Sequence, residues 1–328
     1  MRSGEANERA TVTDGLKVDV RKPKLSLDVT VLMGGPSSER AVSLLSGEAV
    51  AEGLTAAGHR VMRADISPDD ASALDRPGLD VVFIALHGPF GEDGGVQQLC
   101  EDRKLRYIGS GPEASALALD KVASRKRFTA AGLVVPKGLV LTPPERDEQT
   151  DELNRLGLPV VLKPVDGGSS VDITIAKTPS ARDTAVADLL DKYGRALAEE
   201  FVVGREFTVG ILGRRPLPVL EIVPARDFYD YTAKYADDSG TRYVFDHGLA
   251  GAVVRSIQTS AMTAHEVLGC RDLSRVDFIV TPGGLPVVLE VNTIPGFTSH
   301  SLVPMAAARV GLDFPQLVDR IVMMAMQR

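Results

Sequence analysis

Residues 275–292 of the 328-residue chain read RVDFIVTPGGLPVVLEVN, and this stretch decides the fold of the last third of the protein. Apolar and polar side chains alternate on both sides of a glycine pair, which is typical of a β-hairpin. If Gly283 and Gly284 form a two-residue turn, each residue faces the one equally distant from the turn. Asp277 then lies opposite Glu290.

The same register brings Arg275 opposite Asn292. Because residues two apart on a strand share a face, all four polar groups converge on one patch. Two carboxylates and an amide oxygen beside a guanidinium are typical ligands of a hard divalent cation, and magnesium bound to a nucleotide fits them. The alternative is a solvated strand face with an Arg–acid pair, and a β-bulge would break the register.

Outward from this hairpin, the sequence predicts a protein of several units, α/β in its first part and α+β in the rest. Residues 28–33 (DVTVLM) predict a strand, followed by a Gly-rich turn and a helix, with further buried strands near 59–66 and 80–86. These elements favour a doubly wound parallel sheet. We expect a flexible tail over 1–26, an N-terminal α/β substrate domain over 27–112, a central domain over 113–203 and a C-terminal antiparallel-sheet domain over 204–328.

The middle of the chain predicts one helix over 114–132 and a strand near 135–141. The runs 158–164 and 171–177 predict a hairpin across the sequence DGGSS. Two more strands of an antiparallel sheet are predicted within 195–212. Lys163 ends a predicted strand before this Gly-rich turn, where it could reach a phosphate, although a solvent-facing lysine is the commoner case.

The composition of the chain excludes several classes of function. The chain has 37 Lys+Arg against 44 Asp+Glu, a net charge of -7, which argues against a nucleic-acid partner. The first 28 residues contain no apolar run of the length that a signal peptide or membrane helix needs, so we expect no membrane partner. Cys100 and Cys270 have no neighbour at CxxC spacing, which excludes a disulfide framework or structural zinc site and favours a reducing cytoplasm.

Several further stretches carry a family resemblance. They are MGGPSSERAVSLLSG, ALHGPFGEDG, YIGSGPEASALALDK, GLPVVLKP with GSSV, FYDYTAKY, LGCRDLSRVDF and LEVNTIPGFTSHSLVPMAA, in this order from residue 28 to about 322. The sequence resembles the D-alanine–D-alanine ligases of the ATP-grasp superfamily. The resemblance implies three domains, with ATP held between the central and C-terminal ones.

The implied reaction joins two D-alanines for peptidoglycan biosynthesis. ATP phosphorylates the carboxylate of the first, and the amine of the second attacks the acyl phosphate. The resemblance further implies ATP and two Mg²⁺ (or Mn²⁺) ions as cofactors, a homodimer and a cytoplasmic location. Metal and cationic groups would neutralise the phosphate charge during transfer.

The resemblance also assigns residues. The implied metal ligands are Asp277, Glu290 and Asn292, in agreement with the hairpin geometry. The implied catalytic groups are Glu39, Ser169, Tyr235, Arg275 and the backbone N–H of Gly296. Contacts to the amino-acid substrates are implied for His87, Ser301 and Leu302. Contacts to ATP are implied for Lys121, Lys163, Ser170, Glu199, Val202, Glu206 and Lys234.

Some of these residues have simpler interpretations. Glu39 could be an ordinary first-turn acid stabilised by the helix dipole, and Ser301 could be a helix cap. Val202 could be a core residue. Tyr235, implied to bond with Glu39 and Ser169 in a triad that favours an amine as second substrate, could be an exposed aromatic.

The chain departs from the family pattern at Asp166-Gly167, Asp172 and Asp246-His247. Because a histidine in this lid helps depsipeptide-forming relatives choose a hydroxyl nucleophile, His247 leaves the second substrate open. The rival predictions are a sibling ligase using D-lactate or D-serine and a non-catalytic paralogue. An NAD oxidoreductase ranks low, because no GxGxxG follows the first strand.

Overall fold

A computed structural model describes residues 26–143, 149–168, 171–225, 240–298 and 301–328. Parallel strands form the first sheet in the order β2-β1-β3. The elements here are β1 (Asp28–Met33), α1 (Arg40–Ala56), β2 (Arg60–Asp65), η1 (Ser72–Asp75), β3 (Val81–Ile84) and α2 (Gly95–Asp102). The predicted first strand is confirmed. The prediction that β2 is buried is wrong, because β2 is an edge strand with mostly exposed side chains.

The helix predicted over 114–132 is two helices. They are α3 (Pro112–Leu119) and α4 (Lys121–Ala130). Asp120 separates them: its backbone is extended, and its side chain accepts hydrogen bonds from the backbone N–H groups of Val122 and Ala123, both at 2.9 Å. This N-cap starts a second helix, although the uninterrupted apolar pattern predicts a single helix.

The second sheet is antiparallel and has the order β4-β7-β5-β6. It contains β4 (Gly138–Leu141), β5 (Val160–Pro164), β6 (Thr174–Ala176) and β7 (Ala196–Glu200), with α5 (Thr150–Arg155) and α6 (Pro179–Tyr193) beside it. The predicted β5–β6 hairpin is confirmed, with Val160 opposite Ala176. Apolar side chains from alternate positions of these strands pack with α6 into a core of their own. The side chains between them, such as Val161 and Glu199, therefore lie on the opposite face of the sheet.

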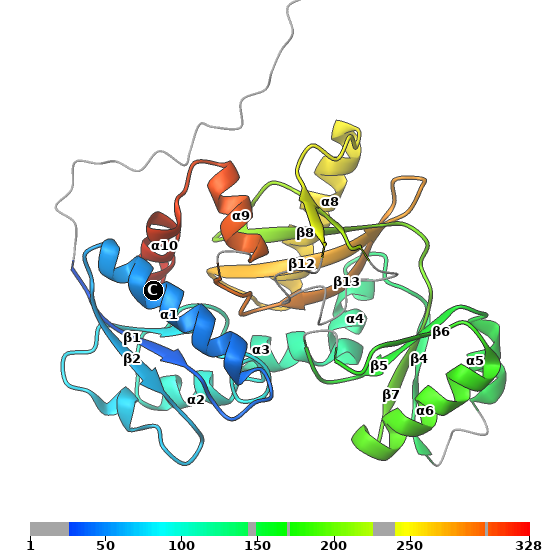
Figure 1. The fold of residues 1–328 in the computed structure, drawn as a ribbon, viewed down its shortest axis with the longest axis horizontal. Helices are drawn as coiled ribbons and strands as arrows, with labels where there is room; N and C mark the ends of the chain where they lie inside the picture. The colour runs from blue at the N-terminus through cyan, green and yellow to red at the C-terminus, as the bar shows by residue number, and fades with distance from the viewer. Residues whose placement is uncertain (1–25, 144–148, 169–170, 226–239, 299–300) are drawn as a thin grey trace, which may run out of the picture.

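The third sheet has the order β11-β10-β8-β12-β13, and β9 pairs with β8. Its strands are β8 (Arg205–Leu212), β9 (Arg215–Pro216), β10 (Leu220–Val223), β11 (Arg242–Val244), β12 (Leu273–Val280) and β13 (Pro286–Asn292), and α8 (Gly251–Val267) covers one face. The two strands predicted within 195–212 do not share a sheet. β7 belongs to the second sheet and β8 to the third, because the residues between them lead from one to the other (Figure 1).

The hairpin that decides the fold has the predicted pairs but a different turn. Arg275 pairs with Asn292, and Asp277 pairs with Glu290, as predicted. The turn is longer than Gly283-Gly284, because the backbone N–H of Thr281 donates to the carbonyl of Leu285 at 3.0 Å. A shift in register between Asp277 and Phe278 compensates for it. The bulge therefore restores the alignment that the longer turn would otherwise shift by one residue.

The ends of the described chain share one core. α9 (Leu302–Arg309) and α10 (Phe314–Met326) follow the third sheet. α10 packs against α1, and its buried apolar side chains join those of β1 and β3 in a single cluster (Figure 1). Among the described residues, no helix is long and apolar enough to cross a membrane. The domain ranges 27–112, 113–203 and 204–328 stay predictions.

Candidate active site

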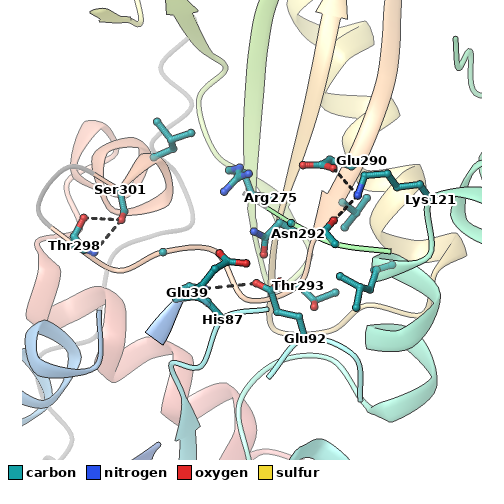
Figure 2. A pocket seen from close by; sticks show the side chains of 17 residues that line it. Glu39, His87, Glu92, Lys121, Arg275, Glu290, Asn292, Thr293, Thr298 and Ser301 are labelled. Carbon is teal, nitrogen blue, oxygen red and sulfur yellow. Dashed lines mark hydrogen bonds and ion pairs between the residues drawn. The ribbon is translucent and has the colours of Figure 1, made fainter. Parts of the chain in front are cut away.

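Three adjoining hollows lie where the sheets approach one another, and Glu290 lines all three. The first, of about 920 Å³, lies between the first and third sheets (Figure 2). The second, of about 1320 Å³, lies between the second and third sheets. A small third hollow, lined by Lys121 and Lys163, adjoins both. We call the first two the substrate hollow and the nucleotide hollow, after the contacts that the sequence resemblance implies for their lining residues, and the third the lysine hollow.

The substrate hollow brings together residues predicted from distant parts of the sequence. Figure 2 shows their side chains arriving from the first sheet, from the α3–α4 junction, from β12 and β13 and from the start of α9. The predicted site residues that line it are Glu39, His87, Lys121, Arg275, Glu290, Asn292, Gly296, Ser301 and Leu302.

The polar patch on β12 and β13 already contains one cation. Arg275 donates two hydrogen bonds to the Asp277 carboxylate, at 2.9 and 2.7 Å. The Thr208 hydroxyl also donates to Asp277, at 2.6 Å. The oxygens of Asp277, Glu290 and Asn292 are hard ligands on one strand face, which suits Mg²⁺ or Mn²⁺. Within the described ranges, no group of three or more His, Cys, Asp or Glu could hold a metal, and the set on this strand face has two carboxylates and one amide.

Lys121 is positioned by the break between α3 and α4. As the first residue of α4, it follows the Asp120 cap directly. Its backbone N–H donates to the carbonyl of Val165 at 3.1 Å, and its ammonium donates to the carbonyl of Gly167. The ammonium also lies 3.7 Å from a carboxylate oxygen of Glu290. A helix that ran through residue 120 would not present this ammonium to the same point.

The nucleotide hollow contains the residues predicted to contact adenine and ribose. Glu199, Val202 and Glu206 line it, together with Asp277 and Glu290. Strand alternation explains this wall. On the second sheet, apolar side chains such as Leu162 and Ala198 point into the core, while their neighbours face the hollow. Lys163 lies on the same cleft-facing side and lines the lysine hollow.

Glu39 is buried beside the first Gly-rich turn. It is the N-cap residue of α1 and its side chain makes no capping hydrogen bond, so its simple interpretation as a first-turn acid rests on the helix dipole alone. The turn is held by Asp65, which accepts hydrogen bonds from the backbone N–H of Gly35 at 3.0 Å and from Arg40 at 2.9 Å. The Arg40 hydrogen bonds, the largest cause, lower the pKa of Asp65 to about 2.

His87 has an acidic partner that the sequence analysis missed. Its Nδ1 lies 3.5 Å from a carboxylate oxygen of Glu92, and its Nε2 lies 3.3 Å from the Ser46 hydroxyl. Glu92 is buried and lines the substrate hollow. Glu92 follows His87 by five residues in HGPFGEDG, a spacing that matches neither helical nor strand periodicity.

The start of α9 forms the far wall of the substrate hollow. Ser301 is the N-cap residue but makes no side-chain cap, so the capping interpretation is wrong. Its hydroxyl instead accepts a hydrogen bond from the backbone N–H of Thr298 at 2.9 Å. A Cβ atom on Gly296 would lie 2.8 Å from this hydroxyl, so the close approach requires glycine. Thr298 and Thr293 also line the hollow and were not predicted.

Of the unusual residues, Gly167 lines the substrate hollow, whereas Asp166, Asp172, Asp246 and His247 do not. The His247 ring packs edge-on against Phe207, with ring centroids 5.4 Å apart. Phe207 points to the opposite face of the third sheet from its neighbour Thr208, which contacts Asp277, so His247 lies behind the site. Burial, the largest cause, lowers the pKa of His247.

The other departures have structural partners. Asp166 accepts a hydrogen bond from Arg195 at 2.7 Å, and Asp172 accepts hydrogen bonds from Lys192 and Tyr193. Four predicted site residues lie outside the described residues: Ser169, Ser170, Lys234 and Tyr235.

Comparisons with known proteins point to one family. Residues 128–323 match the family model described as the D-ala D-ala ligase C-terminus, and residues 67–110 match that of the N-terminus. A D-alanine–D-alanine ligase of Gloeobacter violaceus is 45% identical over 296 residues, covering 90% of this chain and 98% of the relative.

Solved structures agree. The D-alanine–D-alanine ligase of Bacillus anthracis complexed with ATP has a TM-score of 0.80 at 29% identity, covering 92% of this chain and 98% of that one. The VanG D-Ala:D-Ser ligase of Enterococcus faecalis also has a TM-score of 0.80, at 28% identity, covering 92% and 100%.

Proposed function

Since the chain belongs to the D-alanine–D-alanine ligase family and is therefore an ATP-using ligase with the ATP-grasp fold, we propose that it joins two D-alanines through an acyl phosphate. The γ-phosphoryl group of ATP passes to a carboxylate oxygen of the first D-alanine, and ADP leaves. The amine of the second attacks the acyl carbon, and phosphate leaves with the C–O bond electrons. The dipeptide product would serve peptidoglycan biosynthesis.

The observation that carries this proposal is the position of Glu290. It lines the nucleotide hollow on one side and the substrate hollow on the other. A group transferred from a nucleotide to an amino acid must pass between these two spaces, and Glu290 marks their junction. The lysine hollow adjoins the same point, so cationic side chains surround it.

Asp277, Glu290 and Asn292 would hold two Mg²⁺ (or Mn²⁺) ions at this junction. When bound, the ions neutralise the phosphate oxygens of the nucleotide during transfer. The fit rests on the donor set itself: carboxylate and amide oxygens on one strand face, where Asp277 already accepts hydrogen bonds from the Arg275 guanidinium.

Cationic and N–H groups of the chain would stabilise the charge that moves. Arg275 is placed beside the metal ligands, where its guanidinium can bind the transferred phosphoryl group. Lys121 and Lys163 line the lysine hollow and would contact the phosphates, as Ser170 and Lys234 would from outside the described residues. The backbone N–H of Gly296 would donate to the oxyanion formed when the amine attacks.

The remaining predicted residues would bind the substrates. Glu39 would pair with the ammonium of the first D-alanine, and His87, held by Glu92, would lie against the same molecule. Ser301 and the backbone of Leu302 would bind the carboxylate of the second. Adenine and ribose would occupy the hollow lined by Glu199, Val202 and Glu206.

D-Alanine is the proposed second substrate, with an amine rather than the hydroxyl of D-lactate as the nucleophile. D-Serine also offers an amine and is separated from D-alanine by the assay below. The proposed triad of Tyr235, Glu39 and Ser169 favours an amine. The position of His247 supports the same choice, because its ring packs on Phe207 behind the sheet and does not line the substrate hollow. We further propose a homodimer and a cytoplasmic location, the latter because the two buried cysteines are free thiols.

ADP release tests the proposal. The purified chain would be given Mg-ATP with D-alanine, L-alanine, D-serine or D-alanine plus D-lactate, and the products would be identified by mass. We expect release with D-alanine alone and formation of the dipeptide. Turnover only with D-serine or D-lactate would assign the chain to a sibling ligase, and no turnover with any of them would make it a non-catalytic paralogue.

A further inference from the structure

A buried cluster of three charges lies beneath the boundary of the nucleotide and lysine hollows. One carboxylate oxygen of Glu199 on β7 accepts a hydrogen bond from Arg125 on α4, and the other lies 2.6 Å from the Lys163 ammonium on β5. The side chains of Arg125, Glu199 and Lys163 are 11%, 3% and 7% exposed. Ion pairs with so little solvent are screened much less than surface pairs.

Arg125 ties this cluster to the wall of the nucleotide hollow. Its second terminal nitrogen donates to the carbonyl of Pro136, and Pro136 and Glu199 both line that hollow. No role follows for Arg125 from the sequence motifs or from the proposed contacts with ATP. Its guanidinium is nevertheless the group that binds the far oxygen of Glu199.

The cluster is closely packed on the side of β4. Gly138 on β4 lies directly opposite Glu199 in the sheet. A Cβ atom on Gly138 would clash with the carbonyl of Ala198 and would lie 3.1 Å from the Glu199 side chain and 3.2 Å from the Arg125 guanidinium. The glycine lets the guanidinium approach the carboxylate closely.

The charges of the cluster decide what Lys163 can offer to a ligand. With Arg125 present, two cations share one carboxylate, so the cluster keeps a net positive charge. Without Arg125, Glu199 and Lys163 would form a neutral pair, and both carboxylate oxygens would be available to the ammonium. An ammonium has three donors, and each donor turned toward Glu199 is lost to a ligand in the lysine hollow.

We propose that Arg125 is a positioning residue of the nucleotide site. By holding one oxygen of Glu199, it keeps the positive charge of Lys163 directed toward nucleotide phosphates. The inference rests on the proposed function, since it assumes that ATP occupies the nucleotide hollow. It predicts a larger effect on the binding of a ligand that carries phosphates than on the binding of a nucleoside, because the change is one of charge.

The test compares Arg125→Met with Arg125→Lys and with a control, Lys126→Met, in the full chain. Lys126 is the exposed neighbour on the same helix, so its variant removes the same charge outside the cluster. Arg125→Met leaves the Glu199–Lys163 pair intact and should fold, which thermal unfolding checks. Binding of Mg-ATP and of adenosine is measured by calorimetry, and the KM values for ATP and D-alanine are measured separately.

We expect Arg125→Met to weaken Mg-ATP binding on the order of tenfold, from Coulomb energies at this depth. Adenosine binding should change less than about twofold, since the electrostatic effect requires charge on the ligand. The KM for ATP should rise while that for D-alanine stays unchanged. Arg125→Lys should recover most of the affinity, and Lys126→Met should match the wild type.

A double-mutant cycle separates this role from a structural one. In a Glu199→Gln background, Arg125→Met should have almost no further effect on Mg-ATP binding, because the carboxylate through which Arg125 acts is gone. Equal losses for ATP and adenosine, or a full loss in the Gln background, would overturn the inference. Wild-type protein that binds no ATP would instead refute the proposed function, and this inference with it.

Discussion

At the scale of single residues, Glu290 is the side chain on which the proposed chemistry depends most. Glu290→Gln keeps the shape of the side chain but removes the negative charge. We expect ATP-dependent turnover to fall by a factor on the order of 10² or more, because one metal ligand loses its charge. Steady-state ADP release measures this, with thermal unfolding to show that the fold is retained.

A matched control is Glu266→Gln on α8, which changes the same charge at a surface position where the carboxylate lies 3.7 Å from Arg214. This variant should keep wild-type turnover. Full activity in Glu290→Gln would refute the assignment of Glu290 as a metal ligand.

Gly296 gives a second prediction at this scale. A Cβ atom there would lie 2.8 Å from the Ser301 hydroxyl, so Gly296→Ala must displace either the backbone N–H or Ser301. We expect kcat to fall on the order of 10², the usual loss when one oxyanion donor is misplaced. The KM for ATP should not change, since Gly296 does not line the nucleotide hollow.

Gly283→Ala is the control for this substitution, because a Cβ atom at the turn has 3.9 Å to its nearest neighbour, Thr281. Its kinetics should match those of the wild type. An unchanged kcat in Gly296→Ala would remove Gly296 from the proposed mechanism.

At the scale of elements, a buried histidine connects α8 to β12, the strand that contains Arg275 and Asp277. His265 on α8 is 4% exposed, and its Nδ1 lies 2.7 Å from the hydroxyl of Ser274, the residue before Arg275. Burial, the cause of the shift, lowers the pKa of His265 from 6.5 to about 4. The folded protein therefore favours the neutral ring.

This shift predicts a pH dependence of stability. A pKa that is lower in the folded state contributes stability that is fully present above pH 6.5 and is lost as the pH falls toward 4. The difference between the pKa of 6.5 in the unfolded chain and the pKa of about 4 in the folded protein corresponds to about 3 kcal/mol of unfolding free energy. His265→Gln should be less stable than wild type at pH 7.5, and the difference should shrink by about 2–3 kcal/mol at pH 4.5.

Urea unfolding at the two pH values measures this difference. Because every other titrating group is common to both proteins, subtracting the variant from the wild type isolates the histidine. A difference that stays constant between pH 7.5 and 4.5 would show that His265 is not buried in its neutral form.

The element scale also shows how far the sequence could predict the site. The alternation of β12 and β13 was enough to pair Asp277 with Glu290. The length of the turn could not be predicted from this alternation. A longer turn combined with a bulge pairs the same residues as a two-residue turn with no bulge. Only the packing of the sheet selects between these two solutions.

Two other errors have a similar physical origin. An apolar pattern reports which face of a helix is buried but not where a cap interrupts it, so the break at Asp120 was missed. Strands β7 and β8 are neighbours in the sequence, and nothing in their alternation shows that they enter different sheets. Glu92 was missed because a single acid in a loop has no periodic signal.

At the scale of the whole molecule, the cores predict which parts unfold together. One cluster joins β1 and β3 with α10, so the beginning and end of the described chain depend on the same packing. Another cluster, within the second sheet and its helices, contains no residue of the first. Because the two cores share no residue, a cavity made in one core should lower the local stability of that core and leave the local stability of the other unchanged.

Ile321→Ala and Leu162→Ala test this separation as a matched pair. Both side chains are fully buried, Ile321 in the cluster shared by α10 and the first sheet and Leu162 in that of the second sheet. Each truncation should cost about 2–5 kcal/mol of local stability. Hydrogen exchange followed by mass spectrometry should show faster exchange in β1, β3 and α10 for Ile321→Ala, with β4–β7 unchanged, and the reverse for Leu162→Ala. Faster exchange throughout in both variants would mean that the molecule unfolds as one unit, and the first and second sheets could not then open independently.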